Sequence, residues 1–190
     1  EKKLYKYSDV IGCMSQGNID FVLQHNPKLP SQKLVLLPNW HKLIACEEKD
    51  EDIKEKYGFA GKYIAIFGGN IGEPQKVENI VSLAEIYREN NNIIFLVIGN
   101  GTKKKHLENL VAGKGLNNVI IKDFIPGPDY LKLVVVSDVG LISLSEKFTI
   151  PNIPSKTLAY FNAKVPILAA IDANTDYGKI LEESGAGLWS

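Results

Sequence analysis

From Tyr63 to Trp189, short runs of apolar and β-branched residues alternate with segments of helical periodicity. This alternation is typical of βα units and therefore of a parallel sheet. The predicted strands are Tyr63 to Phe67, Ile93 to Ile98, Val119 to Asp123, Val139 to Leu144, Val165 to Ala170 and Ala186 to Trp189. Their nearly continuous apolar composition indicates burial on both faces. We therefore expect an α/β fold, a Rossmann-like open parallel sheet with helices on both faces.

The segments between these strands predict five helices. They are expected from about Pro74 to Glu89, from just after Gly101 to near Gly113, from about Pro128 to Ser137, from Ser155 onward and from about Tyr177 to Ser184. Proline is tolerated at the first helical position. Ser155 can cap the fourth helix, and Gly185 can supply the left-handed residue that ends the last one.

The first forty residues predict a separate βαβ turn. A strand-like Val10 to Met14 precedes a helix-like Asn18 to His25, and Pro38 ends a second strand that begins at Leu34. A single unit of this kind is too small to form its own core. It must pack on the main domain or on a neighbour, so we place a boundary between residues 1–40 and 41–190. The chain starts without methionine and stops just after a strand-like run, and we interpret it as an excised piece of a longer protein, truncated at its C-terminus.

Composition excludes several classes of protein. The 22 basic and 22 acidic side chains cancel, so no sequence-wide field attracts nucleic acid or anionic lipid. Cys13 and Cys46 and the three scattered histidines fit neither a zinc site nor a disulfide framework, and buried reduced thiols are expected. No apolar stretch approaches the roughly 20 residues that span a bilayer, and no targeting segment opens the chain. This indicates a cytoplasmic protein, at most peripheral to a membrane.

Two turns at strand ends could bind phosphate. Gly69-Asn70-Ile71-Gly72 connects the first strand to the first helix, where backbone N–H groups can face an anion and glycine permits its close approach. Pro154-Ser155-Lys156 places a hydroxyl and a cation at the start of the fourth helix. Ligands of open α/β sheets bind beyond the carboxyl ends of the strands, where both turns lie. Glycines chosen only for their dihedral angles would explain the first turn as well.

Three consecutive lysines, Lys103 to Lys105, fall in the first turn of the second helix. Cations are disfavoured there by about 0.3 to 1 kcal/mol each, which a nearby anion would offset. A solvated basic face is the alternative explanation. The preceding Gly99-Asn100-Gly101 does not continue into a dinucleotide fingerprint, and no Ser/His/Asp set, metal cluster or G-x-S-x-G motif is visible.

Taken together, the motifs resemble the donor-binding domain of retaining GT-B glycosyltransferases, specifically bacterial capsule and O-antigen enzymes of the fucosamine transferase type. The resemblance covers about Val35 to Trp189. It is carried by Gly69-Asn70-Ile71-Gly72 with Gln75, Val97 to Gly101, Ser137-Asp138-Val139, Pro154-Ser155-Lys156 with Tyr160, Val165-Pro166-Ile167 and Gly185-Ala186-Gly187.

The resemblance implies that residues 41–190 are a nucleotide-sugar donor-binding domain, one half of a GT-B fold. Residues 1–40 would be the end of the acceptor-side domain, with Leu37 to Trp40 as the crossover between domains. The activity implied is metal-independent transfer of a sugar from a nucleotide diphosphate to a glycan or lipid-linked acceptor in surface polysaccharide synthesis, without a cofactor. The acceptor would bind the missing domain, so this piece alone would bind a donor but transfer little.

The resemblance also implies roles for individual residues. Lys156 would stabilise the leaving diphosphate, and Lys76 or Gln75 would stand near the phosphates. Gly99 to Lys103 and Phe124-Ile125 would border the base. The expected donor-binding residues are Gly69, Asn70, Ile71, Gly72, Gln75, Gly99, Asn100, Gly101, Lys103, Phe124, Ile125, Pro154, Ser155 and Thr157, with Lys156 and Lys76 as catalytic cations and no metal ligands.

One position departs from the pattern. Relatives of this type usually carry glutamate at the position of Ala159, where it is expected to hold the ribose hydroxyls. Its loss puts ribose recognition in doubt and leaves a second hypothesis, a nucleotide-sugar or phosphate-binding module without catalysis. A nicotinamide-binding domain ranks last, because Ile98 is followed by Gly99 rather than by an acidic residue.

Overall fold

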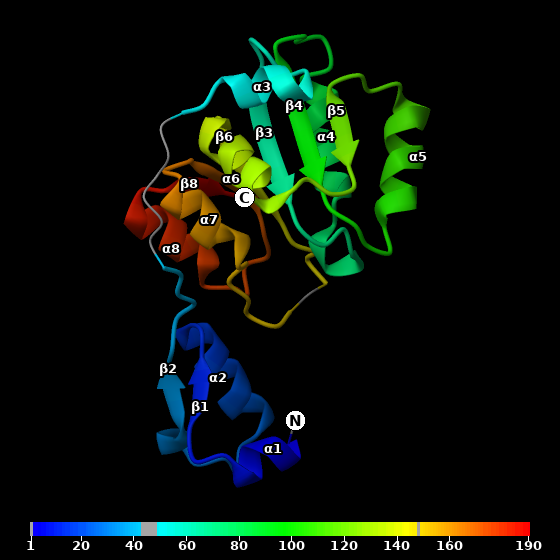
Figure 1. Cartoon of the computed structure of the whole chain (residues 1–190). Coiled ribbons are helices and arrows are strands. Elements are labelled where there is room, and N and C mark those ends of the chain that lie inside the picture. The colour runs from blue at the N-terminus through cyan, green and yellow to red at the C-terminus, as the bar shows by residue number, and fades with distance from the viewer. Residues whose placement is uncertain (1, 43–48, 148) are drawn as a thin grey trace.

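The computed structural model describes residues 2–42, 49–147 and 149–190, in a small N-terminal unit and a larger body (Figure 1). The N-terminal unit consists of α1 (Lys2–Tyr7), β1 (Ile11–Cys13), α2 (Gln16–His25), the 3-10 turn η1 (Ser31–Lys33) and β2 (Leu34–Leu36). Strands β1 and β2 pair in parallel. The predicted βαβ turn is therefore confirmed. Cys13 is a buried free thiol, whereas Cys46 lies outside the described residues.

The larger body contains six parallel strands. Its elements are α3 (Asp52–Tyr57), β3 (Tyr63–Gly68), η2 (Glu73–Gln75), α4 (Glu78–Ile86), β4 (Ile93–Ile98), α5 (Lys104–Lys114), β5 (Val119–Lys122), α6 (Gly127–Val136), β6 (Val139–Ser143), α7 (Lys156–Asn162), β7 (Ile167–Ala170), α8 (Tyr177–Ser184) and β8 (Gly187–Trp189). The strand order is β5-β4-β3-β6-β7-β8. This confirms the predicted Rossmann-like sheet and its six strands, although sequence reasoning gave no helix at α3.

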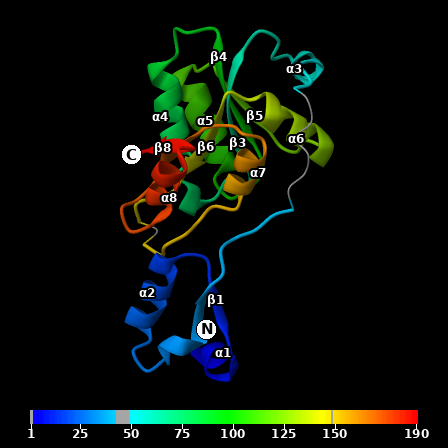
Figure 2. The ribbon, with the colours of Figure 1, turned by 90° about the vertical axis from the view of Figure 1, so that its left-hand side faces the viewer.

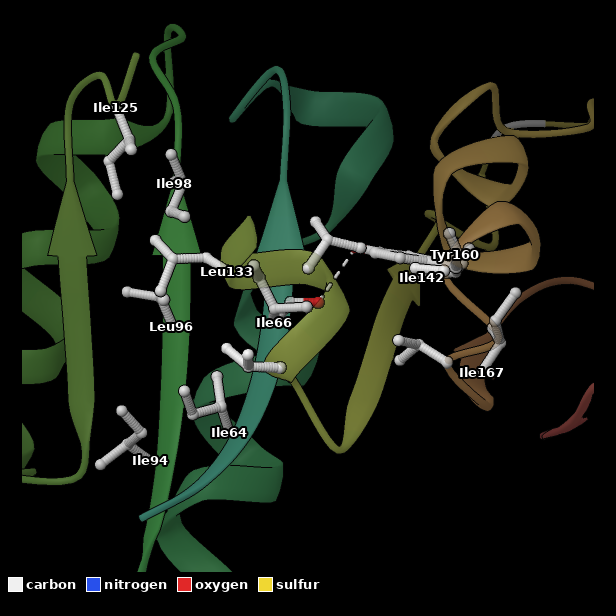
Figure 3. Packing of buried hydrophobic residues seen from close by; sticks show 14 of the residues in the cluster. Ile64, Ile66, Ile94, Leu96, Ile98, Ile125, Leu133, Ile142, Tyr160 and Ile167 are labelled. Atoms are coloured by element: carbon white, nitrogen blue, oxygen red, sulfur yellow. Dashed lines mark hydrogen bonds between the residues drawn. The ribbon is translucent and has the colours of Figure 1, made fainter. Parts of the chain in front are cut away.

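Alternate residues along each strand bury opposite faces of the sheet. On β3, Ile64 and Ile66 belong to the core under α3, α6, α7 and α8, whereas Ala65 and Phe67 belong to the core under α4 and α5. Figure 3 shows the first of these cores, with Leu133 of α6 packed over the strands. Figure 2 shows the two helical layers from the side, with α4 and α6 on opposite sides of the sheet. Helices on both faces were expected and are confirmed.

The prediction of one continuous helix from Pro74 to Glu89 is wrong. The structure has a 3-10 turn at η2, then Lys76 with φ +34°, and only then α4. The Lys76 carbonyl accepts a hydrogen bond from the Ser143 hydroxyl at 2.9 Å, and the Pro74 carbonyl accepts one from the Ser145 amide at 2.8 Å. The Ser143 hydroxyl and the Ser145 amide therefore bind backbone carbonyls that would accept helical hydrogen bonds in a continuous helix. The side-chain periodicity of the sequence does not reveal hydrogen bonds from such distant segments.

One helix end differs from expectation. Ser155 occupies the N-cap position of α7, but its hydroxyl makes no capping hydrogen bond. Helix α5 ends one residue beyond Gly113, and Gly115 with φ +62° is the left-handed residue that closes it. Gly185 does end α8 in the left-handed conformation, as predicted.

The N-terminal unit packs on the larger body through polar contacts. The Gly17 amide donates to an Asp176 carboxylate oxygen at 2.9 Å, and the Asn18 side chain donates to the Pro151 carbonyl at 2.8 Å. Asn39 donates to the Ile153 carbonyl at 3.2 Å, close to the point where the chain passes between the units. Among the described residues, no helix combines the length and apolar character that crossing a bilayer requires.

Candidate functional site

A cavity of about 730 Å³ lies at the carboxyl end of β3, between the larger body and the N-terminal unit. Its lining comes from both parts of the chain: Met14, Asn39, His41, Gly68, Gly69, Asn70, Gln75, Tyr130, Asn152, Ile153, Pro154, Ser155, Lys156, Leu158 and Ala159. Both turns that the sequence singled out contribute to this wall. The site therefore stands at the strand edge where ligands of open α/β sheets bind.

Lys156 is the lysine of this cavity. Its ammonium lies 3.6 Å from the centroid of the Phe67 ring and donates to the Gln75 side-chain oxygen at 3.3 Å. Burial lowers the pKa of Lys156 from its ordinary value of 10.5 to about 7. Among the described residues no carboxylate lines the cavity and Lys156 forms no ion pair. A buried cation without a counter-charge is suited to bind an anion.

The glycine turn beside Lys156 is held by a second loop behind it. The Gly69 amide donates to the Ile98 carbonyl at 2.9 Å, and the Ile71 amide donates to the Asn100 carbonyl at 2.8 Å. Gly99 has φ +148°, and a Cβ there would overlap the Gly69 carbonyl, so this packing requires glycine. Two amides of the turn are thus already engaged. Those of Asn70 and Gly72 have no acceptor among the described residues, and of these two only Asn70 lines the cavity and is left for a ligand.

The structure brings together only part of the predicted site. Gly69, Asn70, Gln75, Pro154, Ser155 and Lys156 line the cavity. The others do not line it: Lys76, Ile71, Gly72, Gly99, Asn100, Gly101, Lys103, Phe124, Ile125 and Thr157. Ile71 and Ile125 are core residues, and Phe124 is exposed. The Thr157 hydroxyl is buried and shares a hydrogen bond of 2.7 Å with Tyr177.

Three other lysines near the strand edge are paired with carboxylates. Lys76 contacts Glu146 at 2.5 Å, and Lys103 contacts Glu73 at 2.5 Å. Lys104 pairs with Asp123. The carboxylate partner raises the pKa of Lys103 and lowers that of Glu73. Lysines at a helix start suggested a nearby anion, and the carboxylates of the protein itself are that anion.

Sequence reasoning missed several lining residues. Tyr130 follows the helical periodicity of α6 together with Leu133, so it was indistinguishable from a core residue. Asn39 and His41 come from the segment that leaves β2, and only the tertiary fold shows that it borders the cavity. Ala159 does line the cavity, where it presents a methyl group.

Comparison with known proteins identifies the family. A family model described as glycosyl transferases group 1 matches residues 48–167. The probable glycosyltransferase WbjE of Pseudomonas aeruginosa is 28% identical over 170 residues, which cover 82% of this chain and 40% of that protein. The putative colanic acid biosynthesis glycosyl transferase WcaI of Escherichia coli K12 is 25% identical over 160 residues, 80% of this chain and 38% of that protein. The chain thus spans about two-fifths of the length of these relatives.

Solved structures show the same fold. Anabaena Alr3699/HepE in complex with UDP superposes with a TM-score of 0.80 at 13% identity, over 100% of this chain and 51% of that chain. WaaG, a glycosyltransferase involved in lipopolysaccharide biosynthesis, superposes with a TM-score of 0.77 at 15% identity, over 94% of this chain and 48% of that chain. These neighbours match the predicted Rossmann-like half of a GT-B structure. Because the family model covers more than half of its residues, the chain belongs to the glycosyl transferases group 1 family.

Proposed function

We propose that this chain carries the donor-binding part of a retaining GT-B glycosyltransferase of the fucosamine transferase type. The enzyme would move a sugar from a nucleotide diphosphate to a glycan or lipid-linked acceptor in the synthesis of a surface polysaccharide such as capsule or O-antigen. Family membership supports the transferase class, and the descriptions of WcaI and WaaG support a role in cell-surface polysaccharides.

Lys156 is the observation on which this proposal rests. Its ammonium is buried, lacks a carboxylate partner among the described residues, and faces a cavity without acidic lining. A diphosphate bound there would raise the pKa of Lys156 again, so binding near neutral pH takes up a proton. As the glycosidic bond to the donor breaks, negative charge grows on the diphosphate, and the ammonium stabilises that charge.

Neutral groups around Lys156 complete the proposed diphosphate site. The unoccupied amide of Asn70 donates from one side. Ser155, whose hydroxyl is not used for helix capping, and Gln75 donate from another. Lys76 and Lys103 join this site only by leaving Glu146 and Glu73, so we assign them to its rim. Phe124 is exposed and available to border the base.

The remaining parts of the proposal concern the whole enzyme. Residues 1–40 would belong to the acceptor-side domain and its crossover, which agrees with the contributions of Met14 and Asn39 to the cavity wall. Because HepE is described in complex with UDP and with UDP-glucose, a uridine diphosphate sugar is the first donor to test. We propose that transfer needs no metal and takes place in the cytoplasm, with peripheral contact to the membrane.

Ala159 favours one alternative function. A methyl group lines the cavity where a carboxylate would hold ribose hydroxyls, so the chain could bind a nucleotide sugar or phosphate without catalysing transfer. Donor turnover separates the two functions.

The test has two steps. Isothermal titration calorimetry with UDP, GDP and UDP-glucose measures donor binding by this chain, and saturable binding of a nucleoside diphosphate is expected. The full-length protein is then assayed for release of UDP from its donor in the presence of a lipid-linked acceptor. Binding with turnover supports the transferase, binding without turnover supports the module, and absence of nucleotide binding contradicts both.

A further inference from the structure

Tyr130 holds a fixed position in the wall of the Lys156 cavity. Its ring is partly buried and packs against the core under α6 and α7. Its hydroxyl lies directly against Gly68 at the end of β3, where a Cβ would overlap the oxygen. Glycine at position 68 therefore gives the tyrosine room to reach the cavity wall, which both residues line.

The Tyr130 hydroxyl has no hydrogen-bond partner in the part of the chain that the structure describes. Two other buried tyrosines nearby are satisfied by the protein. Tyr160 donates to the Ile66 carbonyl at 3.0 Å, and Tyr177 shares a hydrogen bond of 2.7 Å with Thr157. A phenol that is packed in place usually finds a partner. The Tyr130 hydroxyl is therefore available to a partner in the cavity that the residue lines.

Tyr130 and Lys156 flank consecutive residues. The tyrosine hydroxyl lies at Gly68, and the Lys156 side chain runs along Gly69, where a Cβ would come within 3.6 Å of its Cε atom. Both side chains line the same cavity, so one diphosphate bound there can contact both. Burial raises the pKa of Tyr130, so the hydroxyl remains protonated and can donate at neutral pH. The two side chains together offer a neutral donor and a cation.

We propose that Tyr130 is a substrate-binding residue that donates its hydroxyl hydrogen bond to a phosphate oxygen of the donor diphosphate, next to Lys156. This inference rests on the proposed function and adds a residue to its site. A phosphate oxygen is favoured over a sugar hydroxyl, because Tyr130 shares the cavity with the Lys156 ammonium and none of the described residues that line it is a carboxylate.

Tyr130→Phe tests the inference, because it removes only the oxygen. Among the described residues the Tyr130 hydroxyl makes no hydrogen bond, so the urea midpoint should stay at the wild-type value. Affinity for UDP, measured by calorimetry, should fall about 10-fold, the lower end of the range for a hydrogen bond to a charged acceptor. Affinity for inorganic pyrophosphate, measured by NMR titration, should fall by a similar factor. Tyr63→Phe is the matched control, because Tyr63 is exposed at the opposite end of β3, and it should bind like wild type.

Each outcome separates this inference from the proposed function. Unchanged UDP affinity in Tyr130→Phe, with binding lost in Lys156→Met, would overturn the role of Tyr130 and leave the proposed function standing. Weakened binding of UDP with unchanged binding of pyrophosphate would assign the hydroxyl to the nucleoside and overturn the phosphate contact. If the wild-type chain binds neither ligand, the proposed function and this inference both fail.

Discussion

Two groups of lysines lie at the same edge of this sheet and differ in almost every physical respect. Lys156 is buried over an aromatic ring, has no carboxylate partner in the described chain, and has a pKa lowered to about 7. Lys103 and Lys104, at the start of α5, and Lys76, between η2 and α4, pair with Glu73, Asp123 and Glu146. Position at a helix start does not distinguish a ligand-binding lysine from a structural one, but burial without a counter-charge does.

The energetics of the two groups differ accordingly. Exposed ion pairs such as Lys103–Glu73 contribute little to stability, because water and salt screen them. Lys156 instead carries a desolvation cost, because the charged form is taken out of water without compensation. An apolar residue at position 156 would give a more stable fold, so we expect the lysine to serve ligand binding rather than stability. Each prediction below changes one lysine or its protonation.

The largest effect is expected for Lys156→Met, which preserves length and removes the charge. UDP affinity should fall about 10- to 150-fold, the range for a charge-assisted hydrogen bond, as measured by calorimetry. The free energy of unfolding from urea titration at pH 6 should rise, because the buried charge is gone. Lys105→Met, at a position with 81% side-chain exposure, is the control and should change neither quantity. If Lys156→Met binds UDP as tightly as the wild type, Lys156 does not differ from the paired lysines in ligand binding, and the distinction between the two groups is wrong.

The pH dependence of stability should show the titration of Lys156. Its folded-state pKa of about 7 lies below its ordinary value of 10.5, so between these pH values the unfolded chain binds more protons. The free energy of unfolding therefore increases as the pH rises through this window. Relative to Lys156→Met, we expect the wild type to gain at most about 2 kcal/mol between pH 7 and 8.5 in urea titrations. Parallel curves for the two proteins would show that Lys156 titrates normally.

A smaller effect is expected for Lys76→Ala. Because Lys76 is engaged by Glu146 at the rim, its removal should weaken UDP binding about threefold, as expected for an exposed charge. Glu146→Gln releases Lys76 and should strengthen binding slightly. If UDP affinity falls as much in Lys76→Ala as in Lys156→Met, both lysines contact the phosphates directly.

The smallest effect is expected for Lys104→Ala. This side chain pairs with Asp123 and Glu108 and lies outside the cavity. UDP affinity and the urea midpoint should both stay close to their wild-type values, because exposed ion pairs contribute little to stability. A large loss of affinity would mean that the basic cluster of α5 binds the donor as well.

The fold was largely predictable, because the spacing of apolar residues and the apolar content of each segment indicate which residues are buried. Buried strands such as Ile93–Ile98 appear in the sequence as apolar runs. Because these runs alternate with amphipathic helices, only a few sheet topologies are compatible with the sequence. The break at Lys76 was not predictable, because hydrogen bonds from Ser143 and Ser145, some 70 residues away, impose it. The sequence pattern of a helix does not show whether donors from other segments bind its backbone carbonyls.

The site was predictable only in part. Lys156 and the glycine turn stood out because polar residues at strand ends have few structural explanations. Tyr130 did not stand out, since its role depends on Gly68 leaving room for its hydroxyl. The pairing of Lys103 with Glu73 was equally hidden, because the partners lie on different loops. Contacts between segments distant in the chain decide which lysine remains free for a ligand.

Proton uptake on binding tests the central claim most directly. UDP is titrated into the chain at pH 8 by calorimetry in buffers of different ionisation enthalpy, which gives the number of protons taken up. Lys156 is mostly neutral in the free protein at this pH and becomes charged against the diphosphate. Uptake approaching one proton by the wild type, and none by Lys156→Met, is the predicted result. Binding by the wild type without proton uptake would contradict a role for Lys156 as the cation that holds the diphosphate.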